Sequence, residues 1–291
     1  MKYIGKVLSI LGLAGVLAFG NSGLAFAQVY PSEVETHTAL IPEEEEETTI
    51  IEDEEVALAP SFETASMVKK SAKTTHVNNF GYWVYRPTES KEQKLPLIVY
   101  MHGISERGNN LDKLVNVSLP KHLYQKNVNV NAVVIMPQCP TSTTWTKLAD
   151  DVMELINIVK EEENIDETSI SLTGHSLGGI GTWSIAIKYP DVFASLVPVS
   201  STINRPADAT VLVDIPIWSL HGSVDTMTPT SMLQAQKYIE KAGGTKMQVT
   251  LFEGKGHCIT DIVYNNPELD VLNWMASQHR VVKKEPAEEE E

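Results

Sequence analysis

The 291-residue sequence has little cysteine, a deficit of positive charge and only one long apolar run. Its two cysteines, Cys139 and Cys258, are too few to staple a small disulfide-rich fold, so the chain must build an ordinary hydrophobic core. The formal charge of −15 argues against nucleic acid as a partner, because phosphate binding requires a basic surface. A polytopic membrane protein is excluded, since the one long apolar run lies at the N-terminus.

That N-terminal run has the pattern of a secretory leader. Two lysines precede it, and the small-x-small triplet Ala-Phe-Ala at 25–27 follows it. The pattern predicts a signal peptide over residues 1–27, cleaved before Gln28. It therefore predicts a secreted, extracellular protein without membrane contact after cleavage. An uncleaved anchor helix is the alternative, although glycines interrupt the run.

Most of the acidity lies in two flanks, residues 28–75 and 283–291. The first flank contains five glutamates in a row, at 43–47, and its apolar residues show no period. Because like charges repel and too little apolar surface is present to bury, we expect an acidic, disordered linker and an acidic tail. A solvated spacer is the simpler interpretation of the linker, and a wall-spanning or calcium-attracting segment is the alternative.

Residues 76–282 alternate short apolar runs with helical patterns. A continuous apolar run such as LPLIVYM at 95–101 is typical of a buried parallel strand. The patterns predict strands over 95–101, 132–136, 169–173, 195–200, 215–220 and 247–252, and helices over 150–163, 231–242 and 268–277. Residues 82–85, ending near Pro87, predict an early edge strand. Strands that alternate with helices indicate one α/β domain, with a mostly parallel sheet and helices on both faces.

A G-x-S-x-G motif follows the predicted strand at 169–173. Gly174, Ser176 and Gly178 lie between that strand and a helical pattern, where the chain must turn very tightly. The residues two positions either side of the serine must lack a Cβ for the helix to approach. The motif therefore predicts Ser176 as an exposed nucleophile. A serine that merely caps the helix is the alternative.

A serine hydroxyl needs a base, and two later strand ends supply candidates. His257 and Asp225 each follow a later predicted strand. Residues that follow parallel strands meet at one edge of the sheet, so we expect Ser176, Asp225 and His257 to form a catalytic triad. A backbone-bonded loop histidine and a turn aspartate are the alternatives. Of the rival carboxylates, Asp214 precedes its strand, and Asp261 is typical of a helix start.

The remaining candidates surround this edge. The backbone N–H groups of Ile104, after an earlier strand, and Leu177, after the serine, are the expected oxyanion hole. Trp145 either forms an aromatic wall for the acyl group or packs over the sheet edge. Arg107 either pairs with Glu106 to fix its loop or contacts an anionic substrate.

Both cysteines are expected at the same edge, because Cys139 follows a predicted strand and Cys258 adjoins His257. A disulfide would tether the histidine loop. Two free thiols are the alternative, because the strands concerned need not bring the Cα atoms within the roughly 7 Å that a bridge requires.

Taken together, these motifs resemble those of the α/β-hydrolase superfamily. Within it, the chain is similar to a group of secreted esterases and predicted peptidases related to feruloyl and acetyl-xylan esterases, dienelactone hydrolase and prolyl-oligopeptidase-type domains. The resemblance covers residues 80–280. The matching stretches are YMHGISERGNN (100–110), MPQCP (136–140), ISLTGHSLGGIGTW (170–183), YPDVFASLVPVS (189–200), IPIWSLHGSVDTMTP (215–229) and GKGH (254–257). The resemblance implies the α/β-hydrolase fold, whose triad follows the chain order Ser…Asp…His.

The resemblance further implies a serine hydrolase that forms an acyl-enzyme intermediate and needs no metal or other cofactor. Because no long insertion follows residue 200, we expect no large lid and an open site. The expected substrate is a carboxylic ester, either a small molecule or an acyl group on polysaccharide. A serine peptidase of the prolyl-oligopeptidase type and a non-catalytic cell-wall-binding protein on a hydrolase scaffold are the alternatives. The sequence predicts no oligomeric state.

Overall fold

The structure, a computed structural model, describes residues 7–9, 65–87 and 93–281. Within these ranges, no helix combines the length and apolar character that crossing a membrane requires. The expected cleavage site, most of the acidic linker and the acidic tail at 283–291 lie outside the described residues.

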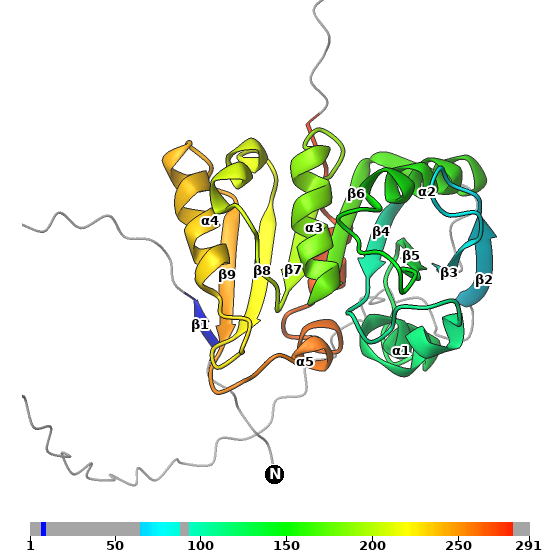
Figure 1. The fold of residues 1–291 in the computed structure, drawn as a ribbon, viewed down its shortest axis with the longest axis horizontal. Coiled ribbons are helices and arrows are strands. Elements are labelled where there is room, and N and C mark those ends of the chain that lie inside the picture. The colour runs from blue at the N-terminus through cyan, green and yellow to red at the C-terminus, as the bar shows by residue number, and fades with distance from the viewer. Residues whose placement is uncertain (1–6, 10–64, 88–92, 282–291) are drawn as a thin grey trace, which may run out of the picture. The chain divides into compact units, whose positions relative to one another are not determined.

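One sheet of nine strands runs through the described chain, in the order β1-β9-β8-β7-β6-β4-β5-β3-β2 (Figure 1). The strands from β9 through β5 in this order are parallel, whereas β1, β2 and β3 make antiparallel pairings. The strands are β1 (Val7–Ser9), β2 (Ser66–Ala72), β3 (Phe80–Arg86), β4 (Leu95–Met101), β5 (Val133–Pro137), β6 (Ile165–His175), β7 (Ser195–Val199), β8 (Ile217–Gly222) and β9 (Met247–Phe252).

Helices cover both faces of this sheet (Figure 1). One face carries α2 (Ala149–Glu162), α3 (Leu177–Lys188), α4 (Thr230–Lys241) and the 3-10 helix η2 (Pro206–Leu212). The other face carries the 3-10 helix η1 (Leu111–Asn116), α1 (Ser118–Tyr124), α5 (Thr260–Tyr264) and α6 (Val271–Ala276). A mostly parallel sheet between two helical layers confirms the predicted α/β-hydrolase fold class.

The central strands supply side chains to both layers. In β4, Leu97, Val99 and Met101 pack beneath the α2–α4 layer, whereas Ile98 and Tyr100 pack beneath α1, α5 and α6. All five are buried. A strand that is buried on both faces is apolar at every position, which explains why the sequence of β4 reads as a continuous apolar run.

The folded region begins earlier than the sequence predicts. β2 is antiparallel to β3 along its whole length, which corrects the predicted start of the domain at residue 76 and the predicted edge position of β3. The residues of β2, SMVKKSA, are exposed or half-buried. They lack the alternating apolar face by which a strand is recognised in a sequence. Its Lys70 instead makes an ion pair of 2.6 Å with Glu162 at the end of α2.

β1 falls inside the segment that the sequence predicts as a signal peptide. It pairs with β9 at the opposite border of the sheet from β2. If residues 1–27 are removed as predicted, β9 becomes the border strand.

The segment between β7 and β8 is short and contains η2 as its only helix. η2 packs against α3 and α4. The described chain therefore carries no large lid after residue 200, between β7 and β8.

Candidate active site

Three chemically reactive side chains lie after the carboxyl ends of three parallel strands. Ser176 directly follows β6, Asp225 follows β8, and His257 follows β9. These strands lie close together in the sheet, with only β7 between β6 and β8. Parallel strands that end at one edge bring residues distant in sequence to the same place.

Ser176 occupies a strained backbone conformation at the turn between β6 and α3. Its φ of 57° and ψ of −115° lie in a region that L-residues rarely adopt. The neighbouring glycines allow the turn: a Cβ on Gly178 would lie 1.8 Å from the carbonyl oxygen of Met101, and a Cβ on Gly174 2.6 Å from the same oxygen. The Ser176 hydroxyl makes no capping hydrogen bond to α3, which sets aside the helix-cap alternative.

Hydrogen bonds join the three side chains in series. The Nε2 of His257 lies 2.8 Å from the Oγ of Ser176, and its Nδ1 lies 2.9 Å from Oδ2 and 3.1 Å from Oδ1 of Asp225. A carboxylate only accepts, so Nδ1–H donates to Asp225 and Nε2 is left to accept the serine proton. The structure thus brings together the three residues that the sequence predicts as a triad.

The Asp225 carboxylate is buried and accepts one further hydrogen bond. The backbone N–H of Met227 donates to Oδ1 at 2.8 Å, and the Nε2 of His221 lies 3.1 Å from Oδ2. His221 Nε2 also bonds the carbonyl of Met227. The N–H groups of Met227 and His257 compensate in part for the removal of the charge from water and orient the carboxylate.

Two additional histidines border the site, and the sequence analysis did not assign them roles. Burial lowers the pKa of His221 and of His175, so both are neutral at pH 7. The ring of His175 lies 4.8 Å from that of His257, and its Nε2 bonds the backbone carbonyl of His257 at 3.0 Å. Their positions at the ends of β6 and β8, within the GHS and HG motifs, are the signal that would have identified them.

The rival carboxylates make other contacts. Asp261 lies in the first turn of α5, where it accepts from His122 Nε2 at 2.7 Å and lies 3.7 Å from Lys121 Nζ. Asp214 precedes β8, at the opposite end of that strand from Asp225. Neither makes a hydrogen bond with His257 among the described residues.

The expected oxyanion donors come from two different elements. Leu177 is the first residue of α3, and Ile104 lies in the loop after β4. Within the described ranges, neither backbone N–H donates to a protein acceptor. The Ile104 side chain is 58% exposed and lines the cleft in front of Ser176.

The loop that carries Ile104 is held by the loop after β5. His102, at the start of the first loop, is buried: its Nδ1 bonds the carbonyl of Gly103 at 2.6 Å, and its Nε2 accepts the N–H of Cys139 at 3.0 Å. Burial lowers the pKa of His102 to about 4, so it is neutral at pH 7. Gln138 adds bonds to the carbonyls of Glu106 and Asn110 at 2.7 and 3.0 Å.

Two predicted substrate contacts instead support this loop. Trp145 is fully buried and donates from Nε1 to the carbonyl of His102 at 2.9 Å, so it cannot form a wall of the cleft. Arg107 bonds the carbonyls of Ile104, Thr141 and Thr143 at 3.3, 3.1 and 3.0 Å and does not line the cleft. The structure therefore corrects the binding role expected for these two residues.

The expected pairing of Arg107 with Glu106 is likewise absent from the described residues, because Arg107 uses its donors on backbone carbonyls. Both cysteines are free thiols. Burial raises the pKa of Cys139 to about 12, whereas Cys258 is exposed and lines the cleft beside His257.

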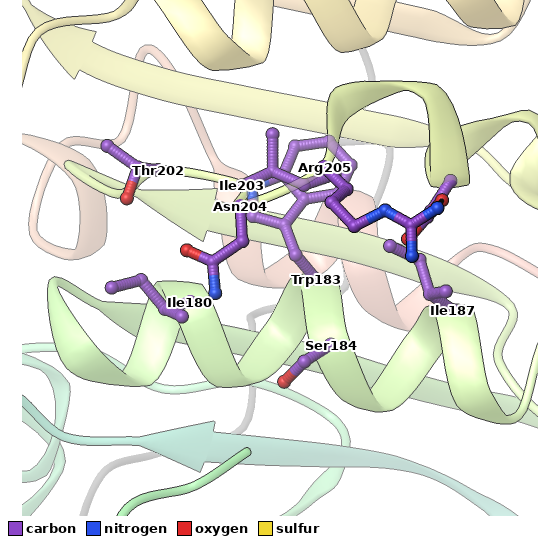
Figure 2. A pocket seen from close by; sticks show the side chains of 9 residues that line it. Ile180, Trp183, Ser184, Ile187, Thr202, Ile203, Asn204 and Arg205 are labelled. Carbon is purple, nitrogen blue, oxygen red and sulfur yellow. Dashed lines mark ion pairs between the residues drawn. The ribbon is translucent and has the colours of Figure 1, made fainter.

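The cleft in front of Ser176 has a volume of about 330 Å³. Its residues come from the loop after β4, from the η1–α1 junction and from the loop between β9 and α5. A second cavity of about 250 Å³ lies between α3 and the segment after β7, and Trp183 and Ile203 are among the residues that line it (Figure 2). The Arg205–Asp208 ion pair of 3.4 Å lies at that cavity, which contains neither Ser176 nor His257.

Comparisons with known proteins place the chain in a family. The model of the dienelactone hydrolase family matches residues 89–268. A thermostable esterase of known structure is 25% identical, with a TM-score of 0.62 over 74% of this chain and 63% of that one. This chain thus spans less than two thirds of the length of that esterase. Among curated proteins, none matches the chain.

More distant structures share the fold. The feruloyl esterase module from Clostridium thermocellum, solved with sinapinate, is 14% identical, with a TM-score of 0.59 over 78% of this chain and 94% of that one. The acetyl xylan esterase from Aspergillus awamori is 16% identical, with a TM-score of 0.54 over 67% of this chain and 95% of that one.

Proposed function

The chain belongs to the dienelactone hydrolase family, and from that membership we propose that it is a serine hydrolase that cleaves carboxylic esters through an acyl-enzyme intermediate. The observation that most supports this proposal is the hydrogen-bond series from Asp225 through His257 to Ser176, with separations of 2.9 and 2.8 Å. This arrangement gives a serine hydroxyl the base that it lacks on its own.

In the proposed reaction, Ser176 Oγ attacks the ester carbonyl while His257 Nε2 takes the hydroxyl proton. Asp225 holds the imidazole in the correct tautomer and stabilises its charged form. The N–H groups of Ile104 and Leu177 bind the tetrahedral oxyanion, each contributing about 3 kcal/mol. The C–O bond to the leaving alcohol then breaks and His257 returns the proton to it. Water, activated by the same imidazole, releases the acid and restores the serine.

We propose that the natural substrate is an ester on a bulky carrier such as polysaccharide, and that the protein acts outside the cell. An open cleft supports a bulky carrier, because Ile104 is 58% and Val117 40% exposed at the border of the cleft, and no large insertion in the described part of the chain covers them. The structurally similar feruloyl and acetyl xylan esterases are consistent with it. The leader pattern at 1–27 supports the second point.

The test is hydrolysis of p-nitrophenyl acetate compared with proline-linked p-nitroanilide peptides. We expect the acetate to be cleaved faster by the wild-type protein, and Ser176→Ala to lose the activity while its circular dichroism spectrum is unchanged. Faster cleavage of the peptides would favour the serine peptidase. Absence of any Ser176-dependent turnover would favour a non-catalytic binding protein.

A further inference from the structure

Glu106 is an acidic residue of the catalytic cleft that the proposed reaction does not use. It belongs to the ERG motif, in which Arg107 bonds backbone carbonyls instead of pairing with it. Glu106 lines the cleft together with Ser176 and His257, and its side chain is only 17% exposed. Among the described residues, no donor makes a hydrogen bond to its carboxylate. A largely buried charge without a partner is costly, so this position favours a ligand that supplies the partner.

His102 is near Glu106 but does not neutralise it. The Nδ1 of His102 lies 4.0 Å from Oε2 of Glu106. However, this Nδ1–H donates to the carbonyl of Gly103 at 2.6 Å, and Nε2 accepts the N–H of Cys139. Burial lowers the pKa of His102 to about 4, so its ring is neutral at pH 7. The charge of Glu106 is therefore left uncompensated.

The other charged pair of the cleft is already balanced. Lys121 lies 3.7 Å from the carboxylate of Asp261, which also accepts from Nε2 of His122 at 2.7 Å. Lys121 and Asp261 both line the cleft. Among the described residues of the lining, Glu106 is thus the carboxylate without a cation. The cleft should therefore attract a positively charged group and repel an anion.

His175 places a second acceptor beside Glu106. Burial lowers the pKa of His175, and its Nε2–H donates to the carbonyl of His257 at 3.0 Å, so Nδ1 carries a lone pair. A Cβ on Gly103 would lie 3.0 Å from Oε2 of Glu106 and 3.5 Å from Nδ1 of His175. Both acceptors therefore face the same space beside Gly103, within the lining of the cleft. A positively charged group with several N–H donors fits this pair of acceptors.

This space adjoins the groups that the proposed reaction uses. Gly103 directly precedes Ile104, the expected oxyanion donor, and His175 directly precedes Ser176. In ester cleavage the leaving oxygen must face His257, which returns the proton to it. A group beside the oxyanion loop therefore belongs to the acyl half of the ester.

We propose that Glu106 and His175 form an ammonium site, which binds the amino group of an aminoacyl ester next to its carbonyl. This inference rests on the proposed ester hydrolysis at Ser176. It deepens that function by naming the acyl group that is released from the carrier as an amino acid. The bound ammonium also offsets the unfavourable effect that the carboxylate of Glu106 has on an oxyanion nearby.

Two pairs of isosteric esters test the proposal. The acyl pair is ethyl alaninate and ethyl 2-methylpropanoate, in which a methyl group replaces the ammonium. Their alkaline hydrolysis rates correct for the electron-withdrawing effect of the ammonium. At about pH 6.5, where an α-amino group is protonated, the corrected kcat/KM of the amino ester should exceed that of its isostere about 10-fold or more. The alcohol pair, acetylcholine and 3,3-dimethylbutyl acetate, should show no such preference.

The variant Glu106→Gln should lower the corrected ratio of the acyl pair about 10-fold, because it removes a hydrogen bond between charged groups. The matched control is Asp261→Asn, which removes the same charge from the cleft lining, where Lys121 and His122 already contact the carboxylate. It should leave the ratio nearly unchanged. A wild-type ratio near one, equal effects of the two variants, or a stronger preference within the alcohol pair would overturn the proposal.

Failure of the ammonium site is distinguishable from failure of the catalytic proposal. Ser176-dependent cleavage of the esters without an ammonium preference contradicts only the ammonium site. If no ester is cleaved, the catalytic proposal fails, and NMR titration with alaninamide and 2-methylpropanamide decides the ammonium site. Tighter binding of alaninamide that Glu106→Gln weakens supports the site. Equal affinity of the two amides, or a preference that the variant keeps, contradicts it.

Discussion

At the scale of single residues, the turn at Ser176 depends on the absence of a Cβ at Gly174 and Gly178. Strain of the kind seen at Ser176 costs about 1–3 kcal/mol and persists only where the surroundings enforce it. Here β6 and β4 press the turn against the start of α3, leaving no room for a side chain at Gly174 or Gly178. The G-x-S-x-G spacing made this feature predictable from the sequence, because steric exclusion depends only on residue type.

The first prediction concerns Gly178, where an added Cβ would come closest to its neighbours. We expect Gly178→Ala to destabilise the protein by about 2 kcal/mol or more and to lower esterase activity, because its Cβ would lie 1.8 Å from the carbonyl oxygen of Met101. Urea denaturation provides the measurement. The matched control is Gly256→Ala, whose Cβ would meet nothing within 4 Å and should leave stability nearly unchanged. Equal stability of the two variants would contradict the steric account of the turn.

His102 gives a second prediction, on pH dependence. Its folded pKa of about 4 lies below the unfolded value of 6.5, so the unfolded chain gains a proton first as the pH falls. The stability that neutral His102 provides is complete above pH 6.5 and is lost as the pH falls towards 4. Between pH 7.5 and 4.5 this loss is about 2–3 kcal/mol.

A non-titrating His102→Gln variant should lose less stability than the wild type over that range. Urea denaturation of both proteins at the two pH values measures the difference, in which contributions from the other histidines cancel. Equal losses would show that His102 is not held neutral by burial.

At the scale of elements, the loop after β4 is held in place by the loop after β5. Arg107 bonds carbonyls in both loops, and the N–H of Cys139 bonds His102. The ERG and PQCP motifs of the sequence therefore belong to one scaffold that positions the expected oxyanion donor at Ile104. Sequence reasoning left Arg107 and Trp145 open between a substrate contact and a structural role, because the sequence does not show that backbone carbonyls occupy their donors.

This scaffold gives a third prediction. We expect Arg107→Ala to lower kcat for p-nitrophenyl acetate about 10-fold with little change in KM, because a displaced N–H at Ile104 weakens binding of the transition state more than of the substrate. The control is Arg205→Ala, whose guanidinium pairs only with Asp208 within the described chain. A change confined to KM would instead support a direct contact of Arg107 with substrate.

The elements themselves were predictable to different degrees. β4, β5 and β7 are buried on both faces, so their apolar runs marked them clearly. β2 was missed because its side chains face solvent or make ion pairs, and its strand conformation depends on pairing with β3. The partners of Asp225 were only partly predictable: His257 followed from its strand end, whereas the contact with His221 depends on the fold.

At the scale of the whole molecule, the described sheet includes β2, which lies ahead of the domain start at residue 76 that the sequence predicts. Besides its pairing with β3, the region that follows β2 contributes Thr74, whose hydroxyl donates to the buried Asp151 of α2 at 2.6 Å. A fourth prediction follows. A chain that starts at residue 65 should retain the fold and the esterase activity of a chain that starts at residue 28. A chain that starts at residue 76 should unfold at lower urea concentration.

The measurements are the urea midpoint and the activity of the three truncated chains. An equally stable chain from residue 76 would show that β2 is dispensable and restore the boundary expected from the sequence. Loss of activity in the chain from residue 65 would give the acidic segment a role in catalysis that the account does not include.

The central claim is that Ser176 is the nucleophile and that His257 activates it. Its most direct test is reaction of the protein with a fluorophosphonate, followed by intact mass measurement and peptide mapping. We predict a single adduct on Ser176, its absence in Ser176→Ala and much slower formation in His257→Ala. An adduct at another residue, or undiminished ester hydrolysis by Ser176→Ala, would contradict the claim.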